Sequence, residues 1–369
     1  MILENLSLTN FKNYSNEQFE FSTNINCFVG QNGSGKTNIL DAIYYLAMTK
    51  SHLQSKDKIL IHSDSNFFLI KCLFTDQKKL KKQTQAAFQI GKRKVIKLDD
   101  VPYKKAIEHI GEIPVVLVTP YDTDVIREGG ETRRKFFDQL FCQLNLNYLQ
   151  DLVKYQNLVK SRNSLLKHFK EKDYFDEDLL ETYNSQLYPL NSKLSSYRKA
   201  FTTELIKHFD LFYKGLSGLK KEKVELSYTT NIEGDQKQLF TENLTKDRVL
   251  CRTAIGIHKD DYVFTLENEL IKEFGSQGQQ KSYILALQLA KFKLLKDQLG
   301  KTPILMLDDI FDKLDQDRIK QLLSLISDTS FGQIFITDTN QERLKKLLAE
   351  IKQPTKYFLI TNGSSETLT

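Results

Sequence analysis

The sequence predicts an α/β fold in which a mixed sheet and an antiparallel β region are joined by an inserted helical lobe. Continuous apolar runs at residues 304–307 and 334–336 are typical of strands buried on both faces of a parallel sheet. Short β-type runs separated by polar turns fill residues 66–100 and indicate an antiparallel sheet. From about residue 132 the apolar spacing becomes helical, which predicts a helical segment between the two sets of strands.

The other expected elements follow in chain order. The first 28 residues alternate apolar and polar side chains and predict two or three strands. Residues 113–118 form one more apolar strand. Apolar side chains between residues 180 and 201 recur at spacings of three and four, which is a heptad-like seam. Pro189 lies inside that seam, so we expect the helix to kink or split there, as part of a short lobe packed on itself.

The C-terminal third returns to an α/β pattern. Strand character appears around residues 223–230 and 262–272, and a helix is expected to start near Gln279. The elements expected to form the sheet with the phosphate loop therefore lie at both ends of the chain. We predict domain limits of 1–130, 131–249 and 250–369, with the middle segment as the helical insertion.

Composition excludes several classes of protein. A chain of 369 residues, 40% hydrophobic and 27% charged, has room for two domains and a large core. No apolar run approaches the roughly 20 residues that cross a bilayer, and residues 1–5 do not resemble a secretory signal. Four scattered cysteines disfavour a disulfide framework or a cysteine metal site. We therefore expect a cytoplasmic protein without a membrane partner.

The net charge of +6 permits a nucleic-acid partner without requiring one. Lysine and arginine side chains cluster at residues 78–82, 92–94 and 104–105, which are candidate contacts to a phosphate backbone. Soluble hairpin tips are an equally good interpretation of these clusters. Arg133 and Arg134 are further candidates, with ion pairs inside the fold as the alternative.

The most informative pattern is G-x-x-x-x-G-K-T at residues 30–37, between an apolar run and an amphipathic run. In a strand–loop–helix context, the backbone N–H groups of such a loop cradle nucleotide phosphates. Lys36 would reach the β- and γ-phosphates, and the Thr37 hydroxyl would hold Mg²⁺. A chance glycine turn is the alternative, and the flanking context disfavours it. The predicted phosphate-binding residues are Gly30, Gln31, Asn32, Gly33, Ser34, Gly35, Lys36, Thr37 and Asn38.

Two acids follow the apolar run at 304–307. A buried strand that ends in a carboxylate delivers a ligand to the metal beside such a loop, so Asp308 is the predicted second Mg²⁺ ligand. Asp309 would lie near the γ-phosphate and could orient or deprotonate the attacking water. We therefore name Asp309 and Lys36 as candidate catalytic residues.

Residues 274–282 precede the last long helix and read Phe-Gly-Ser-Gln-Gly-Gln-Gln-Lys-Ser. An ordinary capped helix start is one interpretation. The string also resembles the signature motif of ABC-type ATPases, commonly L-S-x-G-Q, with Gly275 in place of the leucine. That resemblance implies that Ser276, Gly278 and Gln279 contact nucleotide and that Ser276 takes part in catalysis. Residues 312–315 resemble the D-loop of this superfamily. Thr337 and Asp338 lie where many members carry a switch histidine.

Within that superfamily the chain is similar to the RecF family of bacterial recombinational-repair ATPases over nearly its whole length. Asp41 and Lys259 stand where the family usually has glutamate and arginine, and the Asp308–Asp309 pair matches it. The segments that carry the resemblance are residues 8–14, 30–43, 133–138, 256–261, 278–281 and 308–309.

The resemblance implies an ABC-type ATPase head with an inserted lobe, and ATP and Mg²⁺ as cofactors. In this superfamily two copies enclose two ATP molecules, and each copy's signature motif meets the nucleotide held by its partner. Lys12 is expected to contact phosphate, as the matching basic residue does in related chromosome-maintenance ATPases. Family members bind DNA near single-strand gaps and help partners of the RecO and RecR type to load recombinase during repair and at replication forks.

Three other functions remain open on the sequence alone. A transporter ATPase subunit would usually have a much shorter helical insertion between Thr37 and Ser276. A chromosome-organising or nuclease-partner ATPase would need long uninterrupted heptads, which the broken seam does not provide. A non-enzymatic DNA-binding module is disfavoured by the presence of Lys36, Thr37 and Asp308. Whether the chain turns ATP over as an enzyme, slowly and under stimulation by DNA, is left open.

Overall fold

The computed structural model describes residues 1–217, 222–327, 329–349, 351 and 353–368. Its contacts divide the chain into two compact units. Unit 1 comprises Met1–Thr123, Phe209–Lys221 and Gln277–Thr369, and unit 2 comprises Asp124–His208 and Glu222–Ser276. These units are groups of contacting residues and do not test the predicted domain limits at residues 130 and 249, which stay a prediction.

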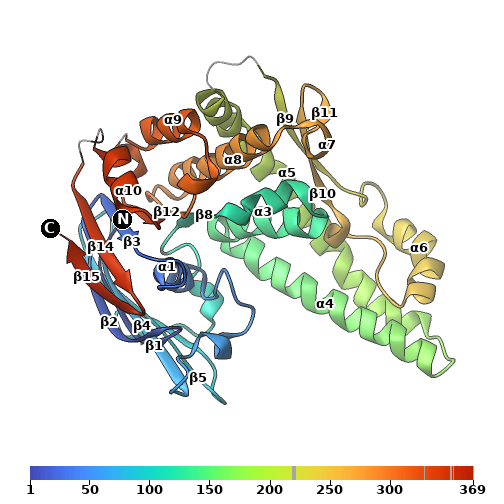
Figure 1. Cartoon of the computed structure of the whole chain (residues 1–369). Coiled ribbons are helices and arrows are strands. Elements are labelled where there is room, and N and C mark those ends of the chain that lie inside the picture. Colours follow the sequence, from blue (N-terminus) through green and yellow to red (C-terminus); the bar gives the residue numbers. More distant parts are fainter. Residues whose placement is uncertain (218–221, 328, 350, 352, 369) are drawn as a thin grey trace. The chain divides into compact units, whose positions relative to one another are not determined.

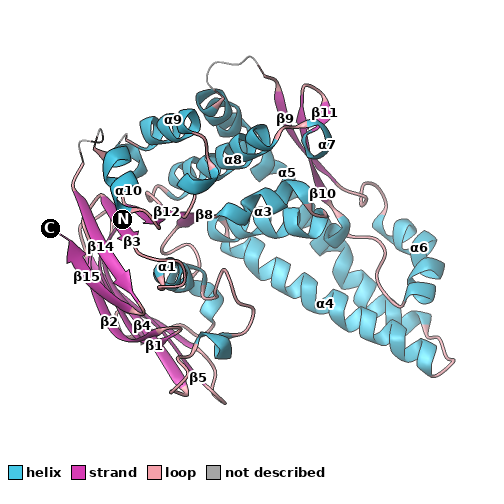
Figure 2. Ribbon diagram, in the orientation of Figure 1, coloured by secondary structure: helices cyan, strands magenta, loops and turns pink. Residues whose placement is uncertain are grey.

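Unit 1 contains a six-stranded mixed sheet with the order β15-β14-β3-β13-β12-β8 (Figures 1 and 2). The five strands from β14 to β8 are parallel, and β15 is antiparallel to β14. Every residue of β3, β8, β12 and β13 is buried, which confirms the prediction drawn from the continuous apolar runs. The strands are β3 (Ile25–Val29), β8 (Val115–Val118), β12 (Ile304–Asp308), β13 (Ile334–Asp338), β14 (Thr355–Thr361) and β15 (Ser364–Leu368).

A second six-stranded sheet, antiparallel throughout, has the order β2-β1-β4-β5-β6-β7. Helix α1 (Lys36–Met48) is buried along most of its length and contacts strands of both sheets, so it forms the centre of the unit 1 core. Aromatic rings fill the space beside it, including a stacked pair of Phe28 and Phe335 at 6.2 Å. The strands are β1 (Ile2–Phe11), β2 (Tyr14–Glu20), β4 (Phe67–Thr75), β5 (Lys81–Gln89), β6 (Val95–Leu98) and β7 (Val101–Pro102).

Helices α8, α9 and α10 also belong to unit 1, in the C-terminal part of the chain. Helix α8 (Gln277–Leu299) starts two residues before the predicted position and is buried through most of its length. Helices α9 (Gln316–Ile326) and α10 (Gln341–Leu348) follow β12 and β13 and contact each other. Short 3₁₀ turns are η1 (Asp57–Leu60), η2 (Ala106–His109), η3 (Pro120–Thr123), η5 (Phe311–Lys313) and η6 (Thr329–Phe331).

Unit 2 is mainly helical, with one small sheet of order β11-β10-β9. Helix α3 packs on β10, where the rings of Phe137 and Tyr262 stack with centroids 3.8 Å apart. The elements are α2 (Asp124–Arg127), α3 (Gly130–Leu144), α4 (Leu146–Glu171), α5 (Glu177–Leu216, its last turns in unit 1), β9 (Val224–Thr229), α6 (Gln236–Leu250), η4 (Ile257–Lys259), β10 (Asp261–Leu266), β11 (Glu269–Leu270) and α7 (Ile271–Phe274).

Helix α5 corrects one part of the expectation that Pro189 kinks or splits the helix. Pro189 lies inside it, and the helix continues as one element for 40 residues, so the proline does not split it. A proline inside a helix removes one backbone hydrogen bond at a cost of about 3 kcal/mol. Leu187, Leu190 and Leu194 are buried around it, and burying a leucine side chain contributes about 1.5–3 kcal/mol each. The packing of the seam therefore outweighs the local preference of proline.

Candidate functional site

The glycine-rich loop connects β3 to α1, in the strand–loop–helix context that the motif requires. Gly35 ends the loop with φ of 117°, a conformation that other residues rarely adopt. A Cβ at this position would lie 2.5 Å from the Asn13 amide nitrogen and 2.9 Å from the Tyr14 hydroxyl oxygen. Glycine is therefore required both for the backbone conformation and for the close approach of the β1–β2 turn.

Side chains of that turn hold the loop in shape. The Asn13 Nδ2 donates to the Ser34 carbonyl at 2.9 Å, and the Asn13 Oδ1 accepts from the Asn38 amide at 2.7 Å. The Tyr14 hydroxyl donates to the Gly35 carbonyl at 3.0 Å. These bonds hold the Ser34 and Gly35 carbonyl groups and thereby fix the conformation of the loop. Nothing in the spacing of Asn13 and Tyr14 marks them as supports of the loop.

Lys36 begins α1, and its side chain returns over the loop. The Nζ donates to the carbonyl oxygens of Gly30 and Gln31, both at 2.9 Å. Burial lowers the pKa of Lys36, while the nearby carboxylates of Asp309 and Asp308 act in the opposite direction. The Lys36 ammonium is available to a phosphate, because a charge-assisted bond to phosphate would be stronger than either carbonyl bond.

Asp308 joins the loop to the end of β12. Its Oδ1 accepts from the Thr37 hydroxyl at 3.0 Å and from the Thr337 hydroxyl at 2.7 Å. Burial raises the pKa of Asp308, and the two hydroxyl donors oppose that rise. The two residues predicted from sequence as metal ligands, Thr37 and Asp308, therefore lie within hydrogen-bond distance of each other.

Asp309 occupies a left-handed backbone conformation with φ of 49°, which is uncommon for a residue with a side chain. Its backbone N–H donates to the Thr337 hydroxyl oxygen at 2.9 Å. Within the described part of the chain its Oδ1 is buried and has no hydrogen-bond partner. Burial raises the pKa of Asp309, and the carboxylates of Asp312 and Asp338 raise it further. The structure thus contains a carboxylate with spare capacity to accept a proton.

Thr337 is the link between the two acids. Its hydroxyl donates to Asp308 and accepts from the backbone N–H of Asp309. From the sequence, position 337 shows only that a switch histidine is absent. The hydroxyl is fully buried, so its partners are limited to these neighbours. Thr337 therefore sets the relative placement of Asp308 and Asp309.

The donor set fits Mg²⁺. Among the described residues no group of three or more His, Cys, Asp and Glu side chains is arranged to hold a metal ion. Magnesium usually takes only one or two protein oxygens and completes its shell with phosphate oxygens and water. The Thr37 hydroxyl and the Asp308 carboxylate beside a phosphate loop are such a pair, and these two residues would hold the ion.

A pocket of about 380 Å³ opens next to the loop within unit 1. Gly30, Gln31 and Ser34 form one side of it, and the Ser34 hydroxyl is a buried group without a partner among the described residues. The facing side consists of Thr339, Gln341 and residues 359–362 of the β14–β15 hairpin. The loop therefore borders open space of a size that suits a small polar ligand.

The residues of the signature string are divided between the units. Gly278 and Gln279 lie in the first turns of α8 in unit 1, and Ser276 is the last residue of unit 2 before it. The guanidinium of Arg318 donates to the Ser282 hydroxyl at 2.7 Å, and a Cβ on Gly278 would lie 2.8 Å from its Nη2. The nucleotide contacts of Ser276, Gly278 and Gln279 stay predictions.

Lys12 has a partner in the structure. Its Nζ lies 2.6 Å from the Oδ2 of Asp41 on α1, and the Asp41 side chain is 1% exposed. Asp41 also accepts from the Ser51 hydroxyl and the His52 backbone, both at 2.7 Å. The predicted contact of Lys12 with phosphate stays a prediction. Gln31, Asn32 and Gly33 are exposed at the mouth of the loop, with Ser34, Gly35 and Lys36 buried behind them.

Comparisons with known proteins agree with this geometry. Residues 2–107 match the RecF/RecN/SMC N terminal domain. The DNA replication and repair protein RecF of Flavobacterium johnsoniae is 43% identical over 97% of this chain and 99% of its own length. The chain belongs to the RecF family. The RecF of Cytophaga hutchinsonii is 41% identical over 99% of this chain and 97% of its own. This RecF-family chain is thus related over its full length to DNA replication and repair proteins.

Solved structures support the fold class. The recombination mediator protein RecF-ATPrS of the RecFOR pathway is 28% identical, with a TM-score of 0.90 over 100% of this chain and 98% of that one. An Smc head domain from Pyrococcus furiosus is 16% identical with a TM-score of 0.58, over 100% of this chain and 96% of that one, and shows the fold alone. The prediction of an ABC-type ATPase head with an inserted helical lobe is confirmed. No helix within the described ranges is long and apolar enough to span a bilayer.

Proposed function

We propose that this RecF-family chain is an ATP- and DNA-binding switch of recombinational repair and replication-fork maintenance. ATP with Mg²⁺ joins two copies into a dimer, and slow hydrolysis separates them. The observation that carries the proposal is the chain of contacts from Thr37 through Asp308 and Thr337 to Asp309 beside the glycine-rich loop. Solved relatives named as RecF-ATP and RecF-ATPrS support nucleotide binding by this chain.

The residues have separate tasks in this proposal. Backbone N–H groups of residues 33–37 and the Lys36 ammonium bind the phosphates. Thr37 and Asp308 would hold Mg²⁺, which would supply positive charge beside the phosphates. Asp309 accepts a proton from the attacking water, and its raised pKa brings it closer to the working pH of a general base. The left-handed backbone at Asp309, tied to Thr337, keeps that carboxylate in place.

Dimer formation is an equilibrium that depends on bound ATP. Ser276, Gly278 and Gln279 of one copy contact the triphosphate held by the partner, so ATP stabilises the dimer through contacts that a monomer cannot make. The closed dimer binds DNA near single-strand gaps through its phosphate backbone and assists RecO- and RecR-type partners in loading recombinase. We place this activity in the cytoplasm.

Size-exclusion chromatography with light scattering tests the dimer. We expect a monomer without nucleotide and a dimer with ATP and Mg²⁺. Removing Mg²⁺ with EDTA should return the monomer, because the phosphate charges are then not neutralised. Ser276→Arg should bind nucleotide as a monomer and fail to dimerise, since a long cation replaces a small hydroxyl at the predicted interface. A dimer of unchanged mass in the Ser276→Arg variant would contradict the shared site.

Replacing Asp309 with asparagine should slow ATP hydrolysis by about 100-fold or more, because general-base catalysis contributes about 10²–10⁴-fold. Nucleotide affinity should not fall, since the substitution removes a negative charge near the phosphates. The dimer should then persist long after ATP is added. Single-turnover hydrolysis of radiolabelled ATP measures the rate.

Asp317→Asn is the matched control, because Asp317 is an exposed acid in the first turn of α9. It should hydrolyse ATP at the wild-type rate. If Asp309→Asn also keeps that rate, Asp309 is not the general base, although nucleotide binding and dimerisation could still hold.

A further inference from the structure

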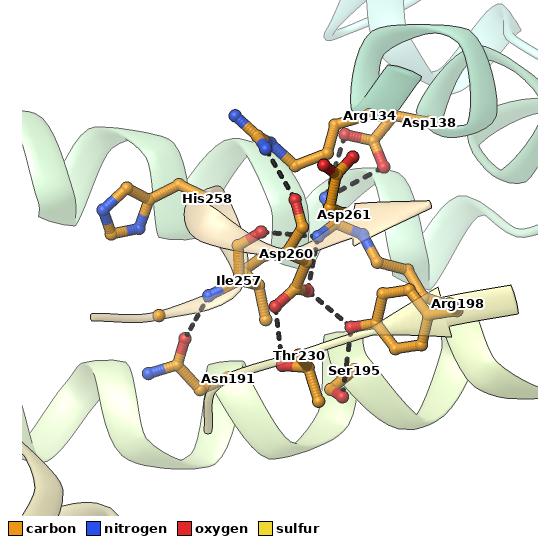
Figure 3. A network of polar contacts seen from close by, with 12 residues as sticks. Arg134, Asp138, Asn191, Ser195, Arg198, Thr230, Ile257, His258, Asp260 and Asp261 are labelled. Carbon is orange, nitrogen blue, oxygen red and sulfur yellow. Dashed lines mark hydrogen bonds and ion pairs between the residues drawn. The ribbon is translucent and has the colours of Figure 1, made fainter. Parts of the chain in front are cut away.

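A buried network of polar contacts fixes the segment 256–261 in unit 2 (Figure 3). The Arg198 side chain is 2% exposed. Its Nη1 donates to the Ile257 carbonyl at 2.6 Å and to the Asp260 Oδ2 at 2.8 Å, and its Nη2 donates to the Asp138 Oδ1 at 3.0 Å. The Asp260 Oδ1 also accepts from the Thr230 hydroxyl at 2.6 Å. Helices α3 and α5 and the end of β9 thus hold one short segment in place.

His258 adds a second anchor to the same segment. Its Nδ1 lies 2.7 Å from the Tyr155 hydroxyl, and its Nε2 lies 2.9 Å from the Thr253 carbonyl. Burial lowers the pKa of His258 to about 4, so the ring is neutral near pH 7 and adds no charge. Gly256 has φ of 131°, and a Cβ there would lie 2.3 Å from the Tyr155 hydroxyl oxygen. The segment is therefore fixed on both sides of Lys259.

Positively charged side chains lie on the segment 256–261 and next to it. Lys259 and Arg252 are exposed residues of the loop, and Lys246 is exposed on α6. The backbone N–H of Arg252 donates to the carbonyl of Asp247, the residue after Lys246, at 3.2 Å. Burial lowers the pKa of Lys259, the positive charges of Arg252, Arg134 and Lys246 lower it further, and the Asp247 carboxylate acts in the opposite direction. Arg134 donates to the Asp260 carbonyl at 2.6 Å, which fixes its guanidinium beside the segment. We call Arg134, Lys246, Arg252 and Lys259 the cation cluster.

The acids nearby are already neutralised by other arginines. Asp261 pairs with Arg133 at 2.7 Å, and Asp247 pairs with Arg162 at 2.7 Å. Asp138 and Asp260 pair with Arg198, as the network shows. Within the described ranges no carboxylate comes within ion-pair distance of Lys246, Arg252 or Lys259. The cluster is thus a repulsive arrangement of positive charge on a rigid support, which an anionic ligand would stabilise.

We propose that the cation cluster binds the phosphate backbone of DNA without reading its sequence. The inference rests on the proposed function and adds to it a contact surface on unit 2. Four cations on α3, α6 and the loop exceed what one phosphate ion can pair with, whereas a DNA strand offers successive phosphates. Because the network holds the loop rigid, binding needs little ordering of the backbone, and exposed Lys259 and Arg252 make the first contacts.

Salt-dependent DNA binding tests the cluster. Fluorescence anisotropy with ATPγS, Mg²⁺ and a labelled gapped duplex gives the dissociation constant at several salt concentrations. Arg252→Ala/Lys259→Ala should weaken binding by about tenfold and reduce the slope of log K against log salt by about 2, since each lost duplex phosphate contact removes about 0.9. The weakening should be equal for unrelated DNA sequences.

Lys160→Ala/Lys199→Ala is the matched control, because both lysines are exposed in unit 2, outside the cluster, and the net charge changes equally. It should keep the wild-type slope. Inorganic phosphate at equal ionic strength should not displace DNA from the wild-type protein if several phosphates are bound together. Displacement by inorganic phosphate at millimolar concentration would overturn the DNA-backbone assignment in favour of a single-ion site.

Different experimental outcomes would contradict the DNA contact of the cation cluster and the proposed ATP switch. If the cluster variant keeps the wild-type affinity and slope while Lys36→Met loses ATP-dependent DNA binding, the cluster is not a DNA contact and the ATP switch survives. Normal DNA binding combined with lost binding to a RecR-type protein would assign the cluster to a protein partner and overturn the inference. If the wild-type protein binds DNA equally with and without ATP, the proposed function itself is wrong.

Discussion

Replacing Lys36 with methionine should reduce the affinity for ATP by about 100-fold or more, which corresponds to about 2.7 kcal/mol of binding free energy. The Lys36 ammonium donates to the carbonyl oxygens of Gly30 and Gln31, and its bond to a phosphate would be stronger than either of these bonds. Methionine has a similar length and cannot donate. The variant also removes a positive charge that acts on the carboxylates of Asp308 and Asp309 and opposes the rise of their pKa values. Isothermal titration calorimetry with ATPγS and Mg²⁺ measures the affinity.

The same substitution at Lys50, an exposed residue just beyond α1, provides the control. Lys50→Met should bind ATPγS as the wild type does. DNA binding should lose its response to ATP in Lys36→Met alone. Equal affinities for the two variants would mean that the glycine-rich loop is not the nucleotide site, and the proposed switch would lose its foundation.

Replacing Arg198 with methionine should destabilise unit 2 by about 3–5 kcal/mol, the cost of removing one partner from a buried ion pair. Arg198 is the shared cation of Asp138 and Asp260, and Asp260 is 1% exposed. Methionine fills much of the volume but leaves the Asp260 carboxylate charged and unpaired in the interior. Urea unfolding monitored by circular dichroism gives the free energy of unfolding, and limited proteolysis shows which unit opens first.

The loss in the Arg198→Met variant should depend on pH. Burial raises the pKa of Asp260 already in the wild type, and removing the cation raises it further. A carboxyl whose pKa is raised in the folded state favours folding below its unfolded pKa, and this stability is lost as the pH rises through the folded value. The variant should therefore recover part of its stability as the pH falls from 7 toward about 5.

Lys199→Met, at the neighbouring exposed position of α5, should unfold like the wild type at every pH. A similar small effect for Arg198→Met would mean that the network contributes little to the stability of unit 2. The segment 256–261 would then be held by other contacts, and the rigid support inferred for the cation cluster would be missing.

Much of the fold followed from local patterns. The continuous apolar runs before residues 30 and 308 predicted buried strands, because a strand covered on both faces has no exposed polar side. The loop between Gly30 and Thr37 was predictable, since phosphate binding needs glycine at defined positions and a helix directly after them. The heptad-like seam predicted the helix correctly, and the structure excludes the split at Pro189 that the sequence suggested as one outcome.

Other parts of the site were not predictable, because they depend on residues that are distant in the chain. The amide of Asn13 and the hydroxyl of Tyr14 support the loop from another strand pair, and neither has a spacing that marks it. The sequence placed Thr337 at the position of a switch histidine, but not its contact with the backbone N–H of Asp309, which lies 28 residues before it. The pairing of Lys12 with Asp41 crosses from β1 to α1 in the same way.

The amino-acid sequence by itself determined which groups can meet a nucleotide: a glycine loop, a lysine, a hydroxyl and a pair of acids, each placed by local strand or helix periodicity. Only the tertiary structure decided how the acids are oriented and which of the described cations form no ion pair with an acid. Parallel strands bring Asp308 and Thr337 side by side. The acids near Arg252 and Lys259 pair with Arg133, Arg162 and Arg198, so among the described residues no carboxylate forms an ion pair with Arg252 or Lys259. The reason is physical. Periodicity acts over a few residues, whereas charge pairing depends on distances in space that the folded chain sets.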